Sequence, residues 1–256
     1  MELQGKRVVI TGAAGGAGVV LAQKFSSAGA RVHICDINSA AVASVVSPDA
    51  GISGSICDCG NVDDVARLFD EALSRLGGLD VLINNVGIAG PTALAEDVTP
   101  EDWDRTIAVN LSGFFYCVRL AIPLLKQAGG GTILNVSSTS ARTALPMRLP
   151  YTVSKVGVLG MTETLARELG PSNIRVNSIL PGWIDNERGN AVFNRKAAAL
   201  GVDPQELKAE GLSFISMRTQ IQPEEIADMM IFLCSDKARH VSGQHIGVCG
   251  NAEYER

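Results

Sequence analysis

The chain has 256 residues, of which 46% are hydrophobic and 19% are charged, and its formal net charge is −5. This composition excludes a disordered chain and a solvated coiled coil, because both carry more charge and fewer apolar residues. The negative charge and the lack of a Lys/Arg tract argue against nucleic acid or an anionic membrane as a partner. The sequence shows no internal repeat and no linker, which predicts a single domain spanning residues 1–256.

Targeting segments and metal motifs are not evident in the sequence. Residues 1–7 lack the apolar core of a signal peptide. The most apolar stretch, residues 106–125, contains Asn110, Arg119 and Pro123 and is therefore a poor membrane span. The cysteines form no CxxC pair and the three histidines form no ligand pattern. We therefore expect buried, reduced thiols, no metal and a cytoplasmic location.

Short β-branched runs alternate with longer helical patterns, as is typical of β-α-β units around a parallel sheet. The predicted strands are residues 7–11, 31–35, 53–57, 79–84, 131–137, 174–180 and 245–249. The predicted helices are residues 17–28, 62–76, 100–126, 151–169 and 223–235. Right-handed crossovers between these strands predict an α/β fold with a doubly wound, parallel, seven-stranded sheet and helices on both faces.

The one long stretch without a clear pattern is residues 182–203. A loop of that length in a compact domain is usually functional, so we predict a substrate lid there. The alternative is a solvated surface loop.

A glycine-rich segment, Thr11 to Gly18 (TGAAGGAG), lies where the first strand turns into the first helix. Glycines let backbone N–H groups approach a phosphate, and the N-terminus of the helix stabilises its charge. Asp36 ends the second predicted strand, where a carboxylate can accept both ribose hydroxyls of an adenosine. The same carboxylate repels a 2′-phosphate, and no Arg or Lys nearby offsets it, which favours NAD over NADP. The alternative is that Asp36 only caps the helix after Ile37.

With these features the chain resembles the short-chain dehydrogenase/reductase family in its compact, single-domain form, which has a Rossmann-type fold. The resemblance spans nearly the whole sequence and rests on the order and spacing of seven motifs. They are Thr11-Gly12-x-x-x-Gly16-x-Gly18, Asp58, Asn84-Asn85-Val86-Gly87, Asn110, Ser138, Tyr151-x-x-x-Lys155 and Pro181-Gly182.

The resemblance implies roles for individual residues. Ser138, Tyr151 and Lys155 would form the catalytic group, and Asn110 would interrupt a helix and hold a water that passes protons to Lys155. It also implies self-association, as a homotetramer, through the helices that start near Pro100 and Tyr151. Together with Asp36, the residues expected to bind the dinucleotide are Gly12, Gly16, Ala17, Gly18, Asp58, Cys59, Asn85, Tyr151, Lys155, Pro181, Gly182, Ile184 and Asn186.

The residues themselves support this chemistry. Tyr151 and Lys155 are four apart in a helical pattern and therefore share one face. An ammonium about 5 Å from a phenolate stabilises it by about 3 kcal/mol at an effective dielectric constant of 20. Ser138 lies at a strand end, where it can donate a hydrogen bond to a substrate oxygen. We expect hydride transfer between a carbinol carbon and nicotinamide, with Tyr151 moving the hydroxyl proton.

Two of the departures from the family pattern lie at the expected cofactor site. Val86 stands where the family usually has Ala, which adds bulk beneath the cofactor. Asn186 stands where a Thr commonly holds the nicotinamide amide, so the geometry of that contact is expected to differ.

The substrate pocket should be lined by residues after Ser138, residues before Tyr151 and residues 182–203. The polar and large side chains there are Arg142, Arg148, Trp183, Asn186, Glu187, Arg188, Asn190, Asn194 and Arg195. They favour a small hydroxylated or anionic substrate, such as a sugar, polyol or hydroxy acid, contacted by Ser138, Tyr151, Arg148 and Trp183. The alternative is that most of the arginines face solvent.

The leading prediction is therefore an NAD-dependent alcohol dehydrogenase or carbonyl reductase. One alternative is an NADP-preferring carbonyl reductase of the same fold. Another is a non-catalytic dinucleotide sensor, against which the joint presence of Asn110, Ser138, Tyr151 and Lys155 argues.

Overall fold

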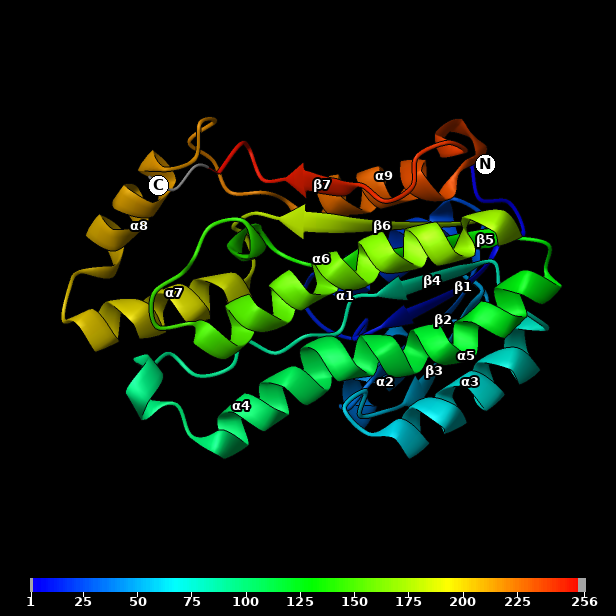
Figure 1. Ribbon diagram of the computed structural model, residues 1–256, viewed down its shortest axis with the longest axis horizontal. Helices are drawn as coiled ribbons and strands as arrows, with labels where there is room; N and C mark the ends of the chain where they lie inside the picture. Colours follow the sequence, from blue (N-terminus) through cyan, green and yellow to red (C-terminus); the bar gives the residue numbers. More distant parts are fainter. Residues whose placement is uncertain (1, 253–256) are drawn as a thin grey trace.

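The structure, a computed structural model, describes residues 2–252 and is built around one parallel sheet (Figure 1). Its seven strands run in the order β3-β2-β1-β4-β5-β6-β7. Their bounds are β1 Arg7–Thr11, β2 Arg31–Asp36, β3 Ile52–Ile56, β4 Val81–Asn84, β5 Gly131–Val136, β6 Ile174–Pro181 and β7 His245–Val248. Each lies within two residues of its predicted range, and the predicted fold class is confirmed.

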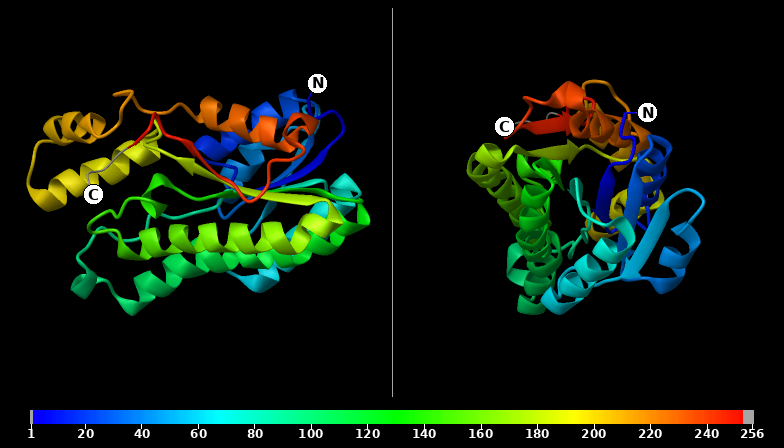
Figure 2. Two further views of the ribbon diagram at one scale, coloured as in Figure 1. Left: turned by 45° about the horizontal axis from the view of Figure 1, so that its top comes forward. Right: turned by 90° about the vertical axis from the view of Figure 1, so that its right-hand side faces the viewer.

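Helices cover both faces of the sheet, because its central strands are apolar on both sides (Figure 2). On one face lie α1 (Ala17–Ser27), α2 (Ser39–Val45) and α9 (Pro223–Cys234), which share a core that includes Phe25 and Met230. The other face carries α3 (Val62–Leu76), α5 (Gly113–Gln127) and α6 (Leu149–Leu169), and its core includes Phe69 and Leu125.

The predicted helix 100–126 is interrupted. It consists of α4 (Pro100–Ile107), a π-helical turn (Ala108–Ser112) and α5. The run Pro100–Gln127 has the length and mean hydropathy, 1.6 over its most apolar window, of a membrane span. Phe114, Cys117 and Val118 of this run are buried in the protein, as in the core helix of a globular protein.

The prediction of an irregular stretch at residues 182–203 was wrong. The chain there forms α7 (Glu187–Leu200), and α8 (Pro204–Ser213) follows it at the periphery of the molecule (Figure 1). Asn186 caps α7 by accepting a hydrogen bond from the N–H of Gly189 (2.7 Å), and Gly201 ends the helix in the left-handed conformation. These helices bury little apolar surface, so they lack the hydrophobic periodicity on which the prediction relied.

Candidate active site

A cleft of about 560 Å³ opens at the carboxyl ends of the strands. It lies where the strand order reverses between β1 and β4, the usual ligand site of a doubly wound sheet. Most of the sequence-predicted site residues line it. They are Gly12, Gly16, Ala17, Gly18, Asp36, Asp58, Cys59, Asn85, Ser138, Arg148, Tyr151, Lys155, Pro181, Gly182, Trp183, Ile184 and Asn186.

The glycine loop wraps tightly over the start of α1. A Cβ atom at Gly18 would lie 2.4 Å from the carbonyl oxygen of Gly12, and one at Gly12 would lie 2.6 Å from the Cα of Val86. Gly12 and Gly16 also have positive φ angles, +62° and +52°. Within the described chain, no side chain caps α1 and no acid lies in its first turn. The loop therefore fits the pyrophosphate of a dinucleotide, whose charge the N-terminus of the helix stabilises.

The loop after β4 is tied to the glycine loop. The Asn85 side chain donates to the carbonyl oxygens of Thr11 (3.0 Å) and Gly12 (2.8 Å). The hydroxyl of Thr11 accepts from the backbone N–H groups of Asn85 and Val86, both at 3.1 Å. These bonds fix the phosphate-binding loop against the next strand. Thr11 begins the glycine motif, but this anchoring role of its hydroxyl was not predicted from the sequence.

Asp36 ends β2 and faces the cleft. Its carboxylate accepts from the N–H groups of Ala14 and Asn38, both at 3.3 Å. The cap of α2 is Asn38, which accepts from the N–H of Ala41 (3.0 Å), so the alternative in which Asp36 caps that helix was wrong.

Asp58 follows β3 and also lines the cleft. Its carboxylate forms an ion pair with Arg105 of α4 (2.8 Å), a partner that the sequence analysis did not identify. Arg105 also lines the cleft, and its pairing with Asp58 neutralises part of the positive charge of the guanidinium there.

Tyr151 and Lys155 project from α6 toward the cleft. The Lys155 side chain is 3% exposed, and its Nζ atom donates to the carbonyl of Val136 (2.8 Å). That Nζ atom lies 5.8 Å from the centre of the Tyr151 ring. Ser138, directly after β5, accepts a bond from the N–H of Ser140 (3.1 Å). One wall of the cleft thus presents a phenol, an ammonium and a hydroxyl.

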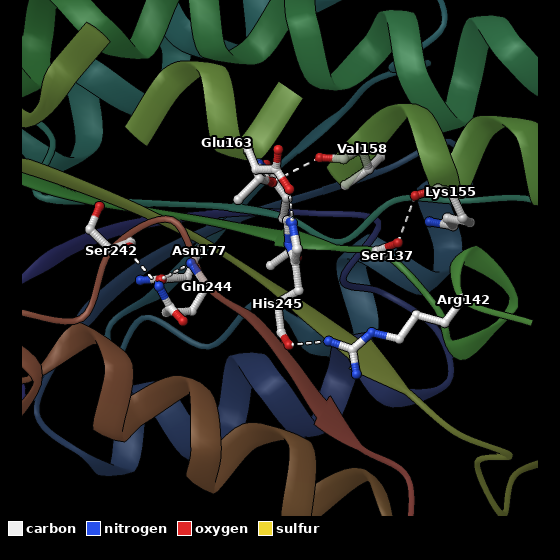
Figure 3. Close-up of polar contacts among 12 residues, drawn as sticks. Ser137, Arg142, Lys155, Val158, Glu163, Asn177, Ser242, Gln244 and His245 are labelled. Carbon is white, nitrogen blue, oxygen red and sulfur yellow. Dashed lines mark hydrogen bonds and ion pairs between the residues drawn. The ribbon is translucent and has the colours of Figure 1, made fainter. Parts of the chain in front are cut away.

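Buried polar bonds hold α6 against the sheet. Asn84 of β4 donates to Asn135 of β5 (2.9 Å), which donates to Thr162 of α6 (3.0 Å). Ser137 donates to the backbone carbonyl of Lys155 (2.8 Å; Figure 3). Because an unpaired buried polar group is costly, these bonds fix the position of α6 along the sheet and its rotation, and hence the positions of Tyr151 and Lys155.

Asn110 lies in the π-helical turn and does not line the cleft. Its side chain accepts from the N–H of Ile88 (2.7 Å) and donates to the Ile88 carbonyl (3.0 Å) and to Ser154 of α6 (3.2 Å). A Cβ atom at Gly87 would lie 3.4 Å from Asn110 Oδ1 and 3.5 Å from Lys155 Nζ, so the two side chains are near neighbours. The water-holding role of Asn110 stays a prediction.

Aromatic residues and one arginine form the outer part of the cleft. Trp183 and Phe193 stack with their ring centres 4.3 Å apart. Arg148, 8% exposed, donates to the carbonyl of Ala89 (2.7 Å), and its guanidinium lies 4.9 Å from the centre of the Tyr151 ring.

Several predicted pocket residues lie elsewhere. Arg142 donates to the backbone carbonyl of His245 at the start of β7 (2.7 Å; Figure 3). Glu187, Asn194 and Arg195 are exposed to solvent, and the side chain of Arg188 is outside the described part of the structure. Asn190 bonds to Gln220 and does not line the cleft. Arg142 and Arg195 are exposed, as the alternative in which most of the arginines face solvent requires, whereas Arg148 lines the cleft.

Three buried thiols, those of Cys35, Cys57 and Cys59, lie close in sequence to Asp36 and Asp58. Interaction with the neighbouring thiols lowers the pKa of Cys57 and raises the pKa of Cys35.

Comparisons with known proteins agree with this architecture. The family described as "Enoyl-(Acyl carrier protein) reductase" matches residues 12–250. The 3-oxoacyl-[acyl-carrier-protein] reductase FabG of Thermotoga maritima is 34% identical over 254 residues, covering 98% of both chains. The D-threitol dehydrogenase of Mycolicibacterium smegmatis is 34% identical, covering 97% of this chain and 93% of that one. The solved structure of a 7α-hydroxysteroid dehydrogenase with NADH and 7-oxo glycochenodeoxycholic acid has a TM-score of 0.90 at 34% identity, covering 99% and 96% of the two chains.

Proposed function

The chain belongs to the short-chain dehydrogenase/reductase family of NAD(P)-dependent oxidoreductases, and we propose that it transfers hydride between NAD and a secondary alcohol or ketone of a small polar molecule. The observation that carries the proposal is that the glycine loop, Asp36, Tyr151 and Lys155 all line the same cleft. A sensor of the same fold, which only binds the dinucleotide, has no use for that catalytic wall.

The chain's own residues handle the proton and the substrate oxygen. The ionised Tyr151 phenol takes the proton of the substrate hydroxyl during oxidation, and the neutral Tyr151 hydroxyl gives it back during reduction. Lys155 stabilises the ionised phenol from a buried position, and Ser138 donates a hydrogen bond to the same substrate oxygen. The bound nicotinamide supplies or accepts the hydride. We assign its surroundings to Pro181, Gly182, Ile184 and Asn186, which line that part of the cleft.

Asn186 can donate a hydrogen bond to the dinucleotide through its amide nitrogen. Its oxygen accepts the capping bond of α7, whereas a Cβ atom at Gly16 would lie 3.7 Å from its Nδ2 atom. Asn186 therefore acts as a donor toward the glycine-loop side of the cleft, and at the same time anchors α7 beside it.

The preference for NAD rests on Asp36. Its carboxylate, at the end of β2, can accept hydrogen bonds from two ribose hydroxyls, and its charge repels a 2′-phosphate. An NADP-preferring reductase is the alternative, and equal or better binding of NADPH than of NADH would favour it.

The substrate is proposed to be a sugar-, polyol- or hydroxy-acid-like molecule. Arg148 offers a positive charge beside Tyr151, and Trp183 and Phe193 offer flat surfaces for a carbon skeleton. We propose α7 and the preceding residues from Gly182 as the substrate lid. The names of the related proteins refer to an acyl-carrier-protein substrate, a tetritol and a steroid. Because these substrates differ, the names support only the reaction type, and we infer the substrate class from the residues that line the pocket.

We further propose a homotetramer located in the cytoplasm. Phe115 of α5 and Val153 and Val156 of α6 are large apolar side chains exposed on the helices through which relatives would associate. Their burial between subunits would remove apolar surface from water.

The decisive experiment is a screen of polyols, sugars and hydroxy acids with NAD, in which turnover is measured as the absorbance of the reduced cofactor. Tyr151→Phe should lower kcat by about 10²- to 10⁴-fold, a far larger effect than its effect on dinucleotide binding. Tyr116→Phe, at a tyrosine of α5 outside the cleft, is the matched control and should keep the parental rate. Parental turnover by Tyr151→Phe would refute the mechanism, and NADH binding without turnover of any carbonyl in a broad panel would favour the sensor.

A further inference from the structure

Three cysteine side chains meet behind the wall of the cleft that carries Asp36 and Asp58. Cys35 lies near the end of β2, and Cys57 and Cys59 follow β3, its parallel neighbour. The Sγ atoms of Cys35 and Cys59 are 3.7 Å apart, and those of Cys57 and Cys59 are 4.0 Å apart. All three lie within 4.8 Å of one another.

Two of these separations, 3.7 Å and 4.0 Å, match the edges of a metal–thiolate polyhedron, and the third pair of sulfur atoms lies within 4.8 Å. Zinc–sulfur bonds of about 2.3 Å place two sulfur ligands about 3.8 Å apart in tetrahedral geometry and about 4.0 Å apart in trigonal geometry. A disulfide has a sulfur–sulfur bond of only about 2.05 Å, which would require a much larger movement of two of the thiols. The cluster therefore fits an ion with little rearrangement.

The surroundings restrict the charge of that ion. The three thiols are at most 2% exposed and belong to an apolar cluster that includes Val65 and Leu68. Three thiolates with a divalent ion leave one net negative charge, whereas a monovalent ion leaves two. Because buried charge is costly, the site favours the divalent ion. Cys57 and Cys59 line the cleft, which gives the ion a route from solvent.

We propose that Cys35, Cys57 and Cys59 bind one thiophilic divalent cation of the Zn²⁺ and Cd²⁺ class. Three sulfur–metal bonds form, three S–H bonds break, and the three protons pass to solvent without any change in oxidation state. A water or another small ligand completes the coordination, as at metal sites with three protein ligands. This site could not be recognised from the sequence, because Cys35 lies next to Cys57 and Cys59 only when β2 pairs with β3.

The test uses the full-length, reduced and metal-free protein titrated with CdCl₂ in weak buffer without dinucleotide. We expect one ion per chain, seen as thiolate-to-cadmium charge-transfer absorption in the ultraviolet, with release of up to three protons. Cys57→Ser should weaken cadmium binding by at least about a hundredfold, since loss of even an outer partner of a metal ligand costs about 10- to 100-fold. Cys249→Ser, outside the cluster, should bind as the wild type does.

Either of two results would overturn the proposal: no stoichiometric absorption band in the wild type, or equal cadmium affinity in Cys57→Ser and Cys249→Ser. If Cys57→Ser does not fold, X-ray absorption of the cadmium-loaded wild type decides, and fewer than three sulfur neighbours would refute the site. Thiol counting after denaturation should find all six cysteines reduced, and a disulfide within the cluster would also overturn it. None of these measurements involves turnover, so their outcome is separate from that of the hydride-transfer proposal.

Discussion

Asp36→Asn isolates the charge that is proposed to set the cofactor preference. Asparagine keeps the shape of the side chain and a carbonyl oxygen that can accept the bond from the Ala14 N–H, 3.3 Å away in the parent. The substitution therefore removes the negative charge while it leaves the turn after β2 intact.

The size of the effect follows from Coulomb's law. Charges of about −1 and −1.75 at about 5 Å repel by roughly 1.5 kcal/mol in water and roughly 6 kcal/mol at an effective dielectric constant of 20. Asp36 is half-buried at the edge of the cleft, so the lower end of this range applies. Since about 1.4 kcal/mol is tenfold in affinity, Asp36→Asn should strengthen NADPH binding at least about tenfold. NADH binding should weaken several-fold, because its ribose hydroxyls lose a charged acceptor.

The assay is equilibrium titration of both reduced dinucleotides into parent and variant, at low and at high salt. The gain in NADPH affinity should shrink with salt, because ions screen a partly exposed charge. Asp49→Asn, at an exposed acid outside the cleft, removes the same charge and should leave both affinities unchanged. An unchanged ratio of the NADPH and NADH dissociation constants in Asp36→Asn would refute the electrostatic argument.

Three further substitutions test the glycine loop, the anchoring of α6 and the ion pair between Arg7 and Asp80. Gly18→Ala places a methyl group 2.4 Å from a carbonyl oxygen of the glycine loop and should weaken NADH binding more than about tenfold in titration, whereas Gly160→Ala, in α6 outside the cleft and with open space around its Cβ, should not. Asn135→Leu breaks two buried hydrogen bonds and should lower the free energy of unfolding in urea by about 2–4 kcal/mol; a loss below about 0.5 kcal/mol would contradict the anchoring role. Burial raises the pKa of Asp80, but its hydrogen bonds and charge pairing with Arg7 outweigh this and leave the pKa lowered. The ion pair thus stabilises the fold above about pH 4, the unfolded value, and this stabilisation is lost as pH falls through the lower folded value. In urea titrations Asp80→Asn should cost about 1–3 kcal/mol at pH 7 and progressively less below pH 4, and a constant difference would refute the linkage.

The strands and the motif positions were predictable because each depends on local sequence. A strand buried on both faces must be apolar throughout, as Val81, Leu82 and Ile83 are, and such a run is visible without any partner. The motif residues follow these runs directly, so locating the strands also placed Ser138 and the glycine loop at the same edge of the sheet.

Features that depend on the approach of distant segments could not be predicted. The bond from Asn85 to Gly12 joins residues 73 positions apart, and the ion pair of Arg105 with Asp58 joins residues 47 positions apart. Arg142 was misplaced because sequence does not show toward which side of a loop a long side chain turns. Neither α7 nor α8 could be recognised by apolar periodicity, since peripheral helices need only capping residues and a small buried contact.

The position of β1 between β2 and β4 bears on how the protein is made. As the chain leaves the ribosome, β1 can pair with β2 at once, but its other flank stays unpaired until residues 81–84 emerge. An open strand flank of that kind is a template for association with other nascent chains. Because Asn85 of the late-arriving segment completes the phosphate-binding loop, the dinucleotide is expected to protect the finished domain from unfolding without assisting the first half of its synthesis.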